Sequence, residues 1–274
     1  MIPAAFEYVV AGSADEAVSA LAEHGDEAKL LAGGMSLIPL MKLRLATPSV
    51  LVDVGRIADL SYIRDAGDHV AIGALARHHD VAHSDLLTQH CAVLASVAAE
   101  VGDPQVRHRG TLGGSIAHGD PASDLPAVLL ALDASVVAHG PSGERTIHAS
   151  DLFVDFLQTA LRPDELLTEI RVPKTGANGF AYEKFNRRAQ DWATVGAVAV
   201  RSNGSTRVAL VNMGTRPVRA AGVEAALAAG ASISEAAERA AEGTEPPDDL
   251  NASPEYRAHL ARVLVRRALE IATG

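Results

Sequence analysis

The chain has 274 residues, of which 48% are hydrophobic and 21% charged, and its formal net charge is −10. These values suit a globular protein with a core for one to three domains, and the acidic balance argues against a nucleic-acid partner. No apolar stretch is long enough to span a bilayer, no basic run would hold an anionic membrane and no signal-peptide pattern begins the chain, so we expect a cytoplasmic protein.

The first part of the chain has the pattern of a β-α-β unit. Ser13 and Glu16 form a capping box, in which the serine hydroxyl accepts from an early N–H group of a helix and the glutamate reaches back. Apolar residues then recur at helical spacing as far as Gly25, where the helix is expected to end. The strands around this helix are expected at residues 6–10, 29–31 and 50–53.

The middle of the chain alternates short strands with helical stretches. Residues 65–68 indicate a hairpin turn, and one long helix is predicted over residues 86–101. Residues 103–119 are rich in glycine and polar side chains and are expected to be the least regular stretch. A helix is predicted at residues 124–132, and strands at residues 135–138 and 144–148.

The last third of the chain has the pattern of a separate α+β unit. Residues 174–179 are the expected boundary. Three strands are predicted at residues 180–185, 194–200 and 207–212. Three helices are predicted at residues 219–229, 233–241 and 254–272. Strands followed by helices indicate an α+β domain rather than an alternating α/β one.

The chain offers no clear metal centre. Its single cysteine, Cys91, can form neither an intramolecular disulfide nor the ligand set of zinc or an iron–sulfur cluster, and its apolar neighbours predict a core position. His79 and His83 are four residues apart, but no glutamate completes a zinc motif and no third ligand is evident. We therefore expect no metal site in this chain.

Two segments, residues 31–37 and 110–116, share an apolar residue, a pair of glycines and then a serine. Paired glycines let successive N–H groups turn toward one anion, and a helix that starts at the serine would favour negative charge at its N-terminus. Neither a Walker motif nor a Rossmann glycine motif is present. The pattern indicates a pyrophosphate gripped by two loops, with ordinary tight turns as the alternative.

These loops occur in a recognisable order. They are followed by Asp-Pro-Ala-Ser-Asp-Leu-Pro at residues 120–126, by residues 182–193 and by a last helix over residues 255–269. Together they resemble the FAD-binding medium subunit of molybdenum hydroxylases, the xanthine dehydrogenase family. The chain length and the segment Asp-Pro-Gln-Val-Arg at residues 103–107 are most similar to the aerobic carbon monoxide dehydrogenases within that family.

The resemblance implies an α+β fold in two domains. Residues 1–175 would form a two-part FAD-binding domain of the vanillyl-alcohol-oxidase (PCMH) type, with lobes of about residues 1–55 and 56–175. Residues 176–274 would form a flavoprotein C-terminal domain with a three-stranded antiparallel sheet and helices. The family also implies two partners, a large molybdopterin subunit and a small subunit with 2Fe–2S clusters, assembled as a dimer of heterotrimers.

In such an assembly this chain would take electrons from the iron–sulfur subunit and pass them to an external acceptor. The flavin carries the chemistry, so no catalytic acid, base or nucleophile is expected on the protein. A quinone is preferred as acceptor because the sequence shows no nicotinamide-binding signature. The resemblance is compatible with a cytoplasmic complex that associates loosely with the inner face of the membrane.

Position by position, the resemblance predicts the residues that contact FAD. Asp124 should accept from FAD hydroxyls, Leu167 should pack near the adenine or ring system, Lys184 should lie close to the flavin and Trp192 beside the isoalloxazine. The pyrophosphate should lie on Ala32, Gly33, Gly34, Met35, Ser36 and Leu37 of the first loop and on Thr111, Leu112, Gly113, Gly114 and Ser115 of the second. The sequence departs from the family pattern at Met35, often a polar residue, at Ser115, often asparagine, and at Trp192, commonly tyrosine.

Simpler structural roles remain open for several of these residues. Asp124 could cap the helix that follows it, Lys184 could be a solvated strand residue and Trp192 could belong to the core. Alternatives for the whole protein are the same subunit of an enzyme for N-heterocycles, aldehydes or xanthine, a self-sufficient flavin reductase of the same fold, and an assembly subunit with empty loops.

Overall fold

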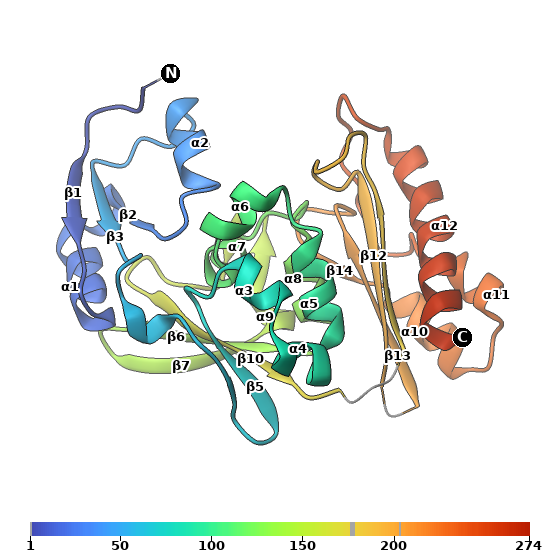
Figure 1. The fold of residues 1–274 in the computed structure, drawn as a ribbon. Helices are drawn as coiled ribbons and strands as arrows, with labels where there is room; N and C mark the ends of the chain where they lie inside the picture. The colour runs from blue at the N-terminus through green and yellow to red at the C-terminus, as the bar shows by residue number, and fades with distance from the viewer. Residues whose placement is uncertain (1, 176–178, 203) are drawn as a thin grey trace.

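The structure is a computed structural model, and it describes residues 2–175, 179–202 and 204–274. Its elements form three parts that lie side by side: an N-terminal lobe, a middle lobe and a C-terminal part (Figure 1). The boundary expected at residues 174–179 falls partly on residues 176–178, which lie outside the described residues. None of the helices in the described ranges is both long enough and apolar enough to cross a membrane.

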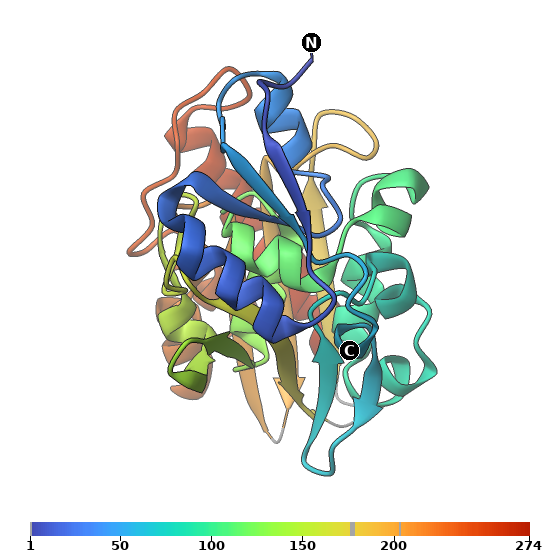
Figure 2. The same cartoon turned by 90° about the vertical axis from the view of Figure 1, so that its left-hand side faces the viewer.

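The N-terminal lobe is the predicted β-α-β unit. Its three-stranded sheet has the order β1-β3-β2, and both pairings are parallel. Ser13 caps the first helix by accepting from the Glu16 N–H group, as the capping box predicts. In Figure 2, where this lobe faces the viewer, α1 lies at the front and α2 stands at the top near the N-terminus. The elements are β1 (Glu7–Val10), α1 (Ala14–His24), η1 (Gly25–Glu27), β2 (Ala28–Leu31), α2 (Leu37–Lys42), β3 (Val50–Asp53) and η2 (Ala58–Leu60).

The middle lobe combines a five-stranded antiparallel sheet with a group of short helices. The strand order is β4-β5-β10-β6-β7, so β10, which comes last in the chain, inserts at the centre. The strands are β4 (Ile63–Asp65), β5 (His69–Gly73), β6 (Ser135–Gly140), β7 (Gly143–His148) and β10 (Leu166–Pro173), with the small hairpin β8 (Phe153–Asp155) and β9 (Gln158–Thr159) beside them. The helices are α3 (His78–Ala82), α4 (Asp85–His90), α5 (Ala92–Ala99), α6 (Pro104–Arg109), α7 (Leu112–His118), α8 (Asp124–Ala131) and α9 (Ala149–Leu152).

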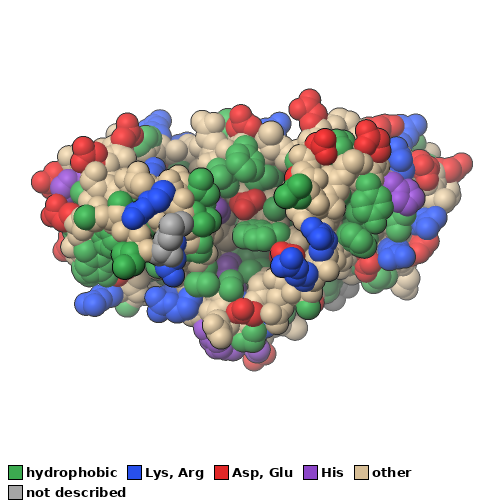
Figure 3. Space-filling view, turned by 90° about the horizontal axis from the view of Figure 1, so that it is seen from above, with side chains coloured by type: hydrophobic (Ala, Val, Ile, Leu, Met, Phe, Trp, Pro, Cys, Tyr) green, Lys and Arg blue, Asp and Glu red, His purple; other side chains and the backbone are tan. Residues whose placement is uncertain are grey.

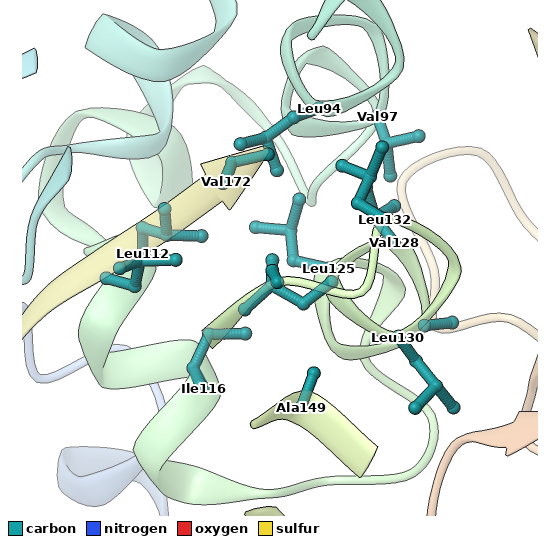
Figure 4. Packing of buried hydrophobic residues seen from close by; sticks show 14 of the residues in the cluster. Leu94, Val97, Leu112, Ile116, Leu125, Val128, Leu130, Leu132, Ala149 and Val172 are labelled. Atoms are coloured by element: carbon teal, nitrogen blue, oxygen red, sulfur yellow. The ribbon is translucent and has the colours of Figure 1, made fainter. Parts of the chain in front are cut away.

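The helices of the middle lobe pack on its sheet through small aliphatic side chains. Leu94 of α5, Leu112 of α7 and Leu125 of α8 converge on Val172 of β10 (Figure 4). All four are buried, and burying each of them stabilises the fold by about 1.5–3 kcal/mol relative to an exposed position. This core fixes α7, and with it the second glycine pair, against the sheet.

Two expectations for this region are wrong. The single helix predicted over residues 86–101 is two helices, α4 and α5, that break at Cys91, whose backbone (φ −147°, ψ 49°) is not helical. Residues 103–119 are not irregular but contain α6 and α7. The side chain of Asp103 caps α6, which has proline in its first turn, and this is a start signal that the glycine-rich composition obscured.

The C-terminal part confirms an antiparallel sheet with helices, but the sheet has four strands rather than three. The order is β11-β12-β13-β14, and the added strand β14 is only two residues long. Because β14 occupies Val218–Arg219, the following helix begins at Ala221 rather than Arg219. The elements are β11 (Phe180–Phe185), β12 (Val195–Ser202), β13 (Ser205–Val211), β14 (Val218–Arg219), α10 (Ala221–Ala228), α11 (Ile233–Ala237) and α12 (Pro254–Thr273).

Alternate residues of this sheet enter two different cores. Val198 and Val200 of β12 are buried in the core of the middle lobe, whereas Ala197 and Ala199 of the same strand are buried against α10 to α12. This follows from the strand period of two. The C-terminal sheet therefore separates α12 on its outer side from α5 and α8 on its inner side (Figure 1), and the middle and C-terminal parts share a continuous apolar interface.

Candidate functional site

The fold brings the two glycine pairs together. A Cβ atom added to Gly33 would lie 2.2 Å from the carbonyl oxygen of Arg109, immediately before the second loop. A Cβ atom on Gly114 would lie 3.9 Å from the Cβ of Ala32. The two loops, about eighty residues apart in the sequence, are therefore in direct contact, with backbone against backbone.

In both glycine pairs, the first glycine is buried and the second is more accessible. Gly33 is buried against Arg109, and Gly113 is buried against Ala74, where an added Cβ would lie 2.5 Å from the alanine Cβ. The second glycine of each pair is more accessible than the first: Gly34 is half-buried and has the left-handed backbone that favours glycine (φ +74°), and Gly114 is exposed. The first glycine thus permits close packing, and the second leaves the backbone open to a ligand.

The first loop presents a row of free donors. Within the described residues, the backbone N–H groups of residues 33–37 donate to no backbone or side-chain acceptor. These groups lead into α2, whose N-cap position is Ser36. Consecutive N–H groups in a turn around a glycine form a concave site for an anion such as a pyrophosphate.

The second loop differs from the first and from the expectation that a helix would start at its serine. Helix α7 starts three residues earlier, and Thr111 is its N-cap, accepting from the Gly114 N–H group at 3.1 Å. The N–H groups of Leu112 and Gly113 donate to the carbonyl oxygens of Ala76 and Ala74, both at 2.9 Å. Ser115 is partly exposed, so this loop offers the exposed Gly114 and a serine hydroxyl rather than a row of free N–H groups.

A basic pocket of about 290 Å³ adjoins the first loop and includes Ala32 and Gly33 in its wall. Three arginines, Arg56, Arg77 and Arg109, line it together with one carboxylate, Asp53. Burial and the neighbouring Arg109 guanidinium lower the pKa of Arg77, but an arginine remains charged at neutral pH. This concentration of positive charge in an acidic protein fits the phosphate part of FAD, and no sequence motif marked it.

Asp124 and Lys184, far apart in the sequence, form a buried ion pair. Lys184 Nζ lies 3.0 Å from Asp124 Oδ2, and the two side chains are 10% and 8% exposed. The hydroxyl of Tyr182, a residue to which the sequence analysis gave no role in the site, donates to Asp124 Oδ1. Burial raises the pKa of Asp124, while Lys184 and Tyr182 oppose that rise. The capping role for Asp124 and the solvated position for Lys184 are therefore both wrong.

Trp192 is on an exposed loop, and 55% of its surface is accessible, so the core alternative for this residue is wrong. The backbone after it is tightly held. Asn212 Nδ2 donates to the Ala193 carbonyl oxygen at 2.8 Å. The fully buried guanidinium of Arg257 donates to the carbonyl oxygen of Thr194. The N–H group of Asn212 also donates to Pro121, which follows the second glycine loop. The Trp192 loop is thus tied to the FAD-binding part of the chain.

Seen from above, the molecule is hollowed between the N-terminal lobe and the C-terminal part, with Lys or Arg side chains on both sides (Figure 3). The loops and the basic pocket supply donors suited to a phosphate-rich cofactor, and the Asp124 carboxylate beside Lys184 supplies acceptor oxygens. Leu112, Thr111 and Leu167 are among the most buried of these predicted contacts, at 0%, 2% and 4% exposed, and Leu112 and Leu167 lie in the middle core. Met35 is 39% exposed at the first loop.

The histidines and the cysteine are placed as follows in the structure. No group of three or more metal-ligating side chains occurs in the part of the chain that the structure describes. His79 stacks on His83 and His108, with ring centroids 4.3 and 4.1 Å apart. Cys91 is buried as expected, and its pKa is raised to about 11 by burial.

Comparison with known proteins gives the family of this chain. A family model described as the FAD binding domain in molybdopterin dehydrogenase matches residues 4–175, and one described as the CO dehydrogenase flavoprotein C-terminal domain matches residues 180–272. The carbon monoxide dehydrogenase medium chain of Hydrogenophaga pseudoflava is 43% identical, covering 99% of this chain and 98% of the relative. The 6-hydroxypseudooxynicotine dehydrogenase complex subunit alpha of Paenarthrobacter nicotinovorans is 39% identical, covering 98% and 95%.

A solved structure gives the same result. The structure of carbon monoxide dehydrogenase from Hydrogenophaga pseudoflava which lacks the Mo-pyranopterin moiety of the molybdenum cofactor matches with a TM-score of 0.95, covering 99% of this chain and 98% of that one. The chain therefore belongs to the family of FAD-binding subunits of molybdopterin dehydrogenases. It is an FAD-dependent oxidoreductase subunit, and both of its domains match those of the carbon monoxide dehydrogenase medium chain.

Proposed function

We propose that this chain carries FAD as the electron-transfer subunit of a carbon monoxide dehydrogenase, between a 2Fe–2S subunit and an external acceptor. The observation that carries the proposal is the row of free N–H groups at residues 33–37, packed directly against the second glycine loop. A row of this kind is suited to an anion. The full-length similarity to carbon monoxide dehydrogenase medium chains supports the class of enzyme.

The residues divide into three groups around the cofactor. The first loop, Ala32 to Leu37, donates N–H groups to the pyrophosphate, and the second, Thr111 to Ser115, closes the other side with the exposed Gly114. Asp124 accepts from FAD hydroxyls, and Leu167 packs near the adenine or ring system. Lys184 places a positive charge close to the flavin, and Trp192 covers one face of the isoalloxazine.

Bound FAD supplies the redox chemistry, so this chain needs no acid, base or nucleophile of its own. Its residues bind and orient the cofactor and set the electrostatic environment. Residues 1–175 would form the FAD-binding domain, with lobes of about 1–55 and 56–175, and residues 176–274 the C-terminal domain; the family-model matches at 4–175 and 180–272 support that division. Trp192, on an exposed loop, controls the approach of the acceptor.

The assembly we propose contains a large molybdopterin subunit and a small iron–sulfur subunit in a dimer of heterotrimers. We place this assembly in the cytoplasm, where it associates loosely with the inner face of the membrane. A quinone is the preferred acceptor. The alternative substrate is an N-heterocycle, because the 6-hydroxypseudooxynicotine dehydrogenase subunit is nearly as similar, at 39% identity, as the carbon monoxide dehydrogenase chain, at 43%.

The test is to purify the chain together with its partner subunits and to follow flavin absorbance. We expect flavin and molybdenum to co-purify, carbon monoxide to bleach the flavin, and a quinone but not NAD to restore its colour. Absence of flavin would refute the proposal in favour of an assembly subunit. Flavin without molybdenum would favour a self-sufficient reductase. Bleaching by an N-heterocycle but not by carbon monoxide would overturn only the substrate.

A further inference from the structure

Three polar side chains meet where Asp124, the first residue of α8, faces two side chains of β11. Tyr182 and Lys184 are two residues apart on β11, so they face the same side of the sheet, toward the middle lobe. The Tyr182 hydroxyl donates to Asp124 Oδ1, and Lys184 Nζ lies 3.0 Å from Asp124 Oδ2. Each carboxylate oxygen therefore has its own donor, and both donors come from the C-terminal sheet.

The carboxylate of Asp124 depends on these two donors. It is 7% exposed, and a buried carboxylate is costly to keep ionised unless hydrogen bonds and an opposite charge compensate for the lost water. Burial raises the pKa of Asp124, and the nearby Glu100 carboxylate acts in the same direction. Lys184 and the Tyr182 hydroxyl act in the opposite direction. Among the described residues, the Tyr182 hydroxyl donates to no carboxylate other than that of Asp124.

We infer that Tyr182 is a positioning residue of the FAD site: its hydroxyl holds the Asp124 carboxylate in place and ionised, so that Asp124 accepts from FAD. This inference rests on the proposed FAD site and deepens it. Tyr182 does not itself need to touch the cofactor. It connects the C-terminal sheet to α8, so that FAD affinity depends on the domain that follows the FAD-binding loops.

The experiment compares FAD binding to the wild-type chain and to Tyr182→Phe across pH. The phenylalanine keeps the aromatic ring and removes only the hydroxyl. The hydrogen bond that is lost joins Tyr182 to Asp124 and not to FAD, so its contribution sets roughly 100-fold as the largest weakening of FAD binding that we expect. Because the pKa of Asp124 rises when its donor is removed, we expect the affinity of Tyr182→Phe to fall on acidification at a higher pH than in the wild type. A general loss of packing would not shift this pH profile.

Tyr62→Phe is the matched control. The Tyr62 hydroxyl donates to Glu169 Oε2 at 2.6 Å, and the Glu169 side chain is 9% exposed, so the same chemical change is made at another shielded carboxylate. We expect this variant to keep wild-type FAD affinity and its pH profile. If both tyrosine variants weaken FAD binding equally, the effect is a general loss of stability and the inference is overturned.

A double-mutant cycle tests whether Tyr182 acts through Asp124. In the Asp124→Asn background, Tyr182→Phe should cause little further loss of FAD affinity. A full additional loss would overturn the inference. If Tyr182→Phe does not fold, Asp124→Asn is the test variant. It should bind FAD more weakly than the wild type, and its affinity should not fall on acidification. Wild-type FAD affinity in Asp124→Asn would overturn the inference. A wild-type chain that binds no FAD would instead refute the proposed function.

Discussion

Replacing Gly33 by alanine tests whether the two loops must touch to make the site. The added Cβ would lie 2.2 Å from the Arg109 carbonyl oxygen and 2.8 Å from the Cα of Gly110. Both neighbours are backbone atoms, which cannot rotate away as a side chain can. An ordinary contact begins at 3.4 Å, and 3.4 minus 2.2 leaves a separation of about 1.2 Å that the loops must open.

The cost of that separation has two parts. Inserting a methyl group into a packed site typically destabilises a protein by about 1–3 kcal/mol. The N–H groups of residues 33–37 also move relative to the second loop. If two hydrogen bonds to a charged phosphate are lost, at about 1.5–3 kcal/mol each, FAD affinity falls by roughly 100-fold or more.

The assay measures FAD per chain and the melting temperature in purified Gly33→Ala. We expect little bound FAD and a melting temperature reduced by a few degrees, about 2–4 °C per kcal/mol for larger domains. Gly214→Ala is the matched control, because its nearest neighbour would be the Val218 Cγ2 atom at 3.4 Å, an ordinary contact. Full FAD occupancy in Gly33→Ala, with wild-type stability, would refute the two-loop site.

Three further predictions concern other parts of the chain. Trp192→Ala should raise flavin fluorescence and change reoxidation by quinone, with stability within about 0.5 kcal/mol because the side chain is 55% exposed; unchanged fluorescence would remove Trp192 from the site. Arg257→Met should lower the free energy of unfolding by about 2 kcal/mol in urea titrations. This loss is smaller than that on breaking a fully buried ion pair, because the partner Asp249 is 40% exposed. Wild-type stability would contradict this prediction. Burial lowers the pKa of His78 from 6.5 to about 4, so on acidification this histidine takes up its proton at a higher pH in the unfolded chain than in the folded one. The free energy of unfolding should therefore fall by up to about 3 kcal/mol as the pH drops from 6.5 to 4. His78→Gln should show a smaller acid-side fall, and equal falls in both proteins would exclude this explanation.

The sequence alone determined the features that depend on neighbouring residues. The capping box at Ser13, the strand alternation after residue 180 and the start of the last helix at Pro254 are local patterns, and each lies within a residue or two of its predicted place. The order of the glycine loops identified the family. These signals survive without a tertiary structure because propensity, capping and periodicity act over a few residues.

Only the tertiary structure decided which residues meet. The helix break at Cys91 was hidden because residues on both sides of it have good helical periodicity, and burial of Cys91 in the core accompanies the break. Tyr182 belongs to a segment that resembles the family, but nothing in the sequence gave it a role in the site, since a tyrosine on a strand is ordinary and its partner Asp124 is 58 residues away. Gly33 and Gly113 look the same as Gly34 and Gly114 in the sequence, but packing against Arg109 and Ala74 separates the first of each pair from the second. Contacts of this kind depend on how the lobes pack, because side chains distant in the chain become neighbours only when the cores between them are buried.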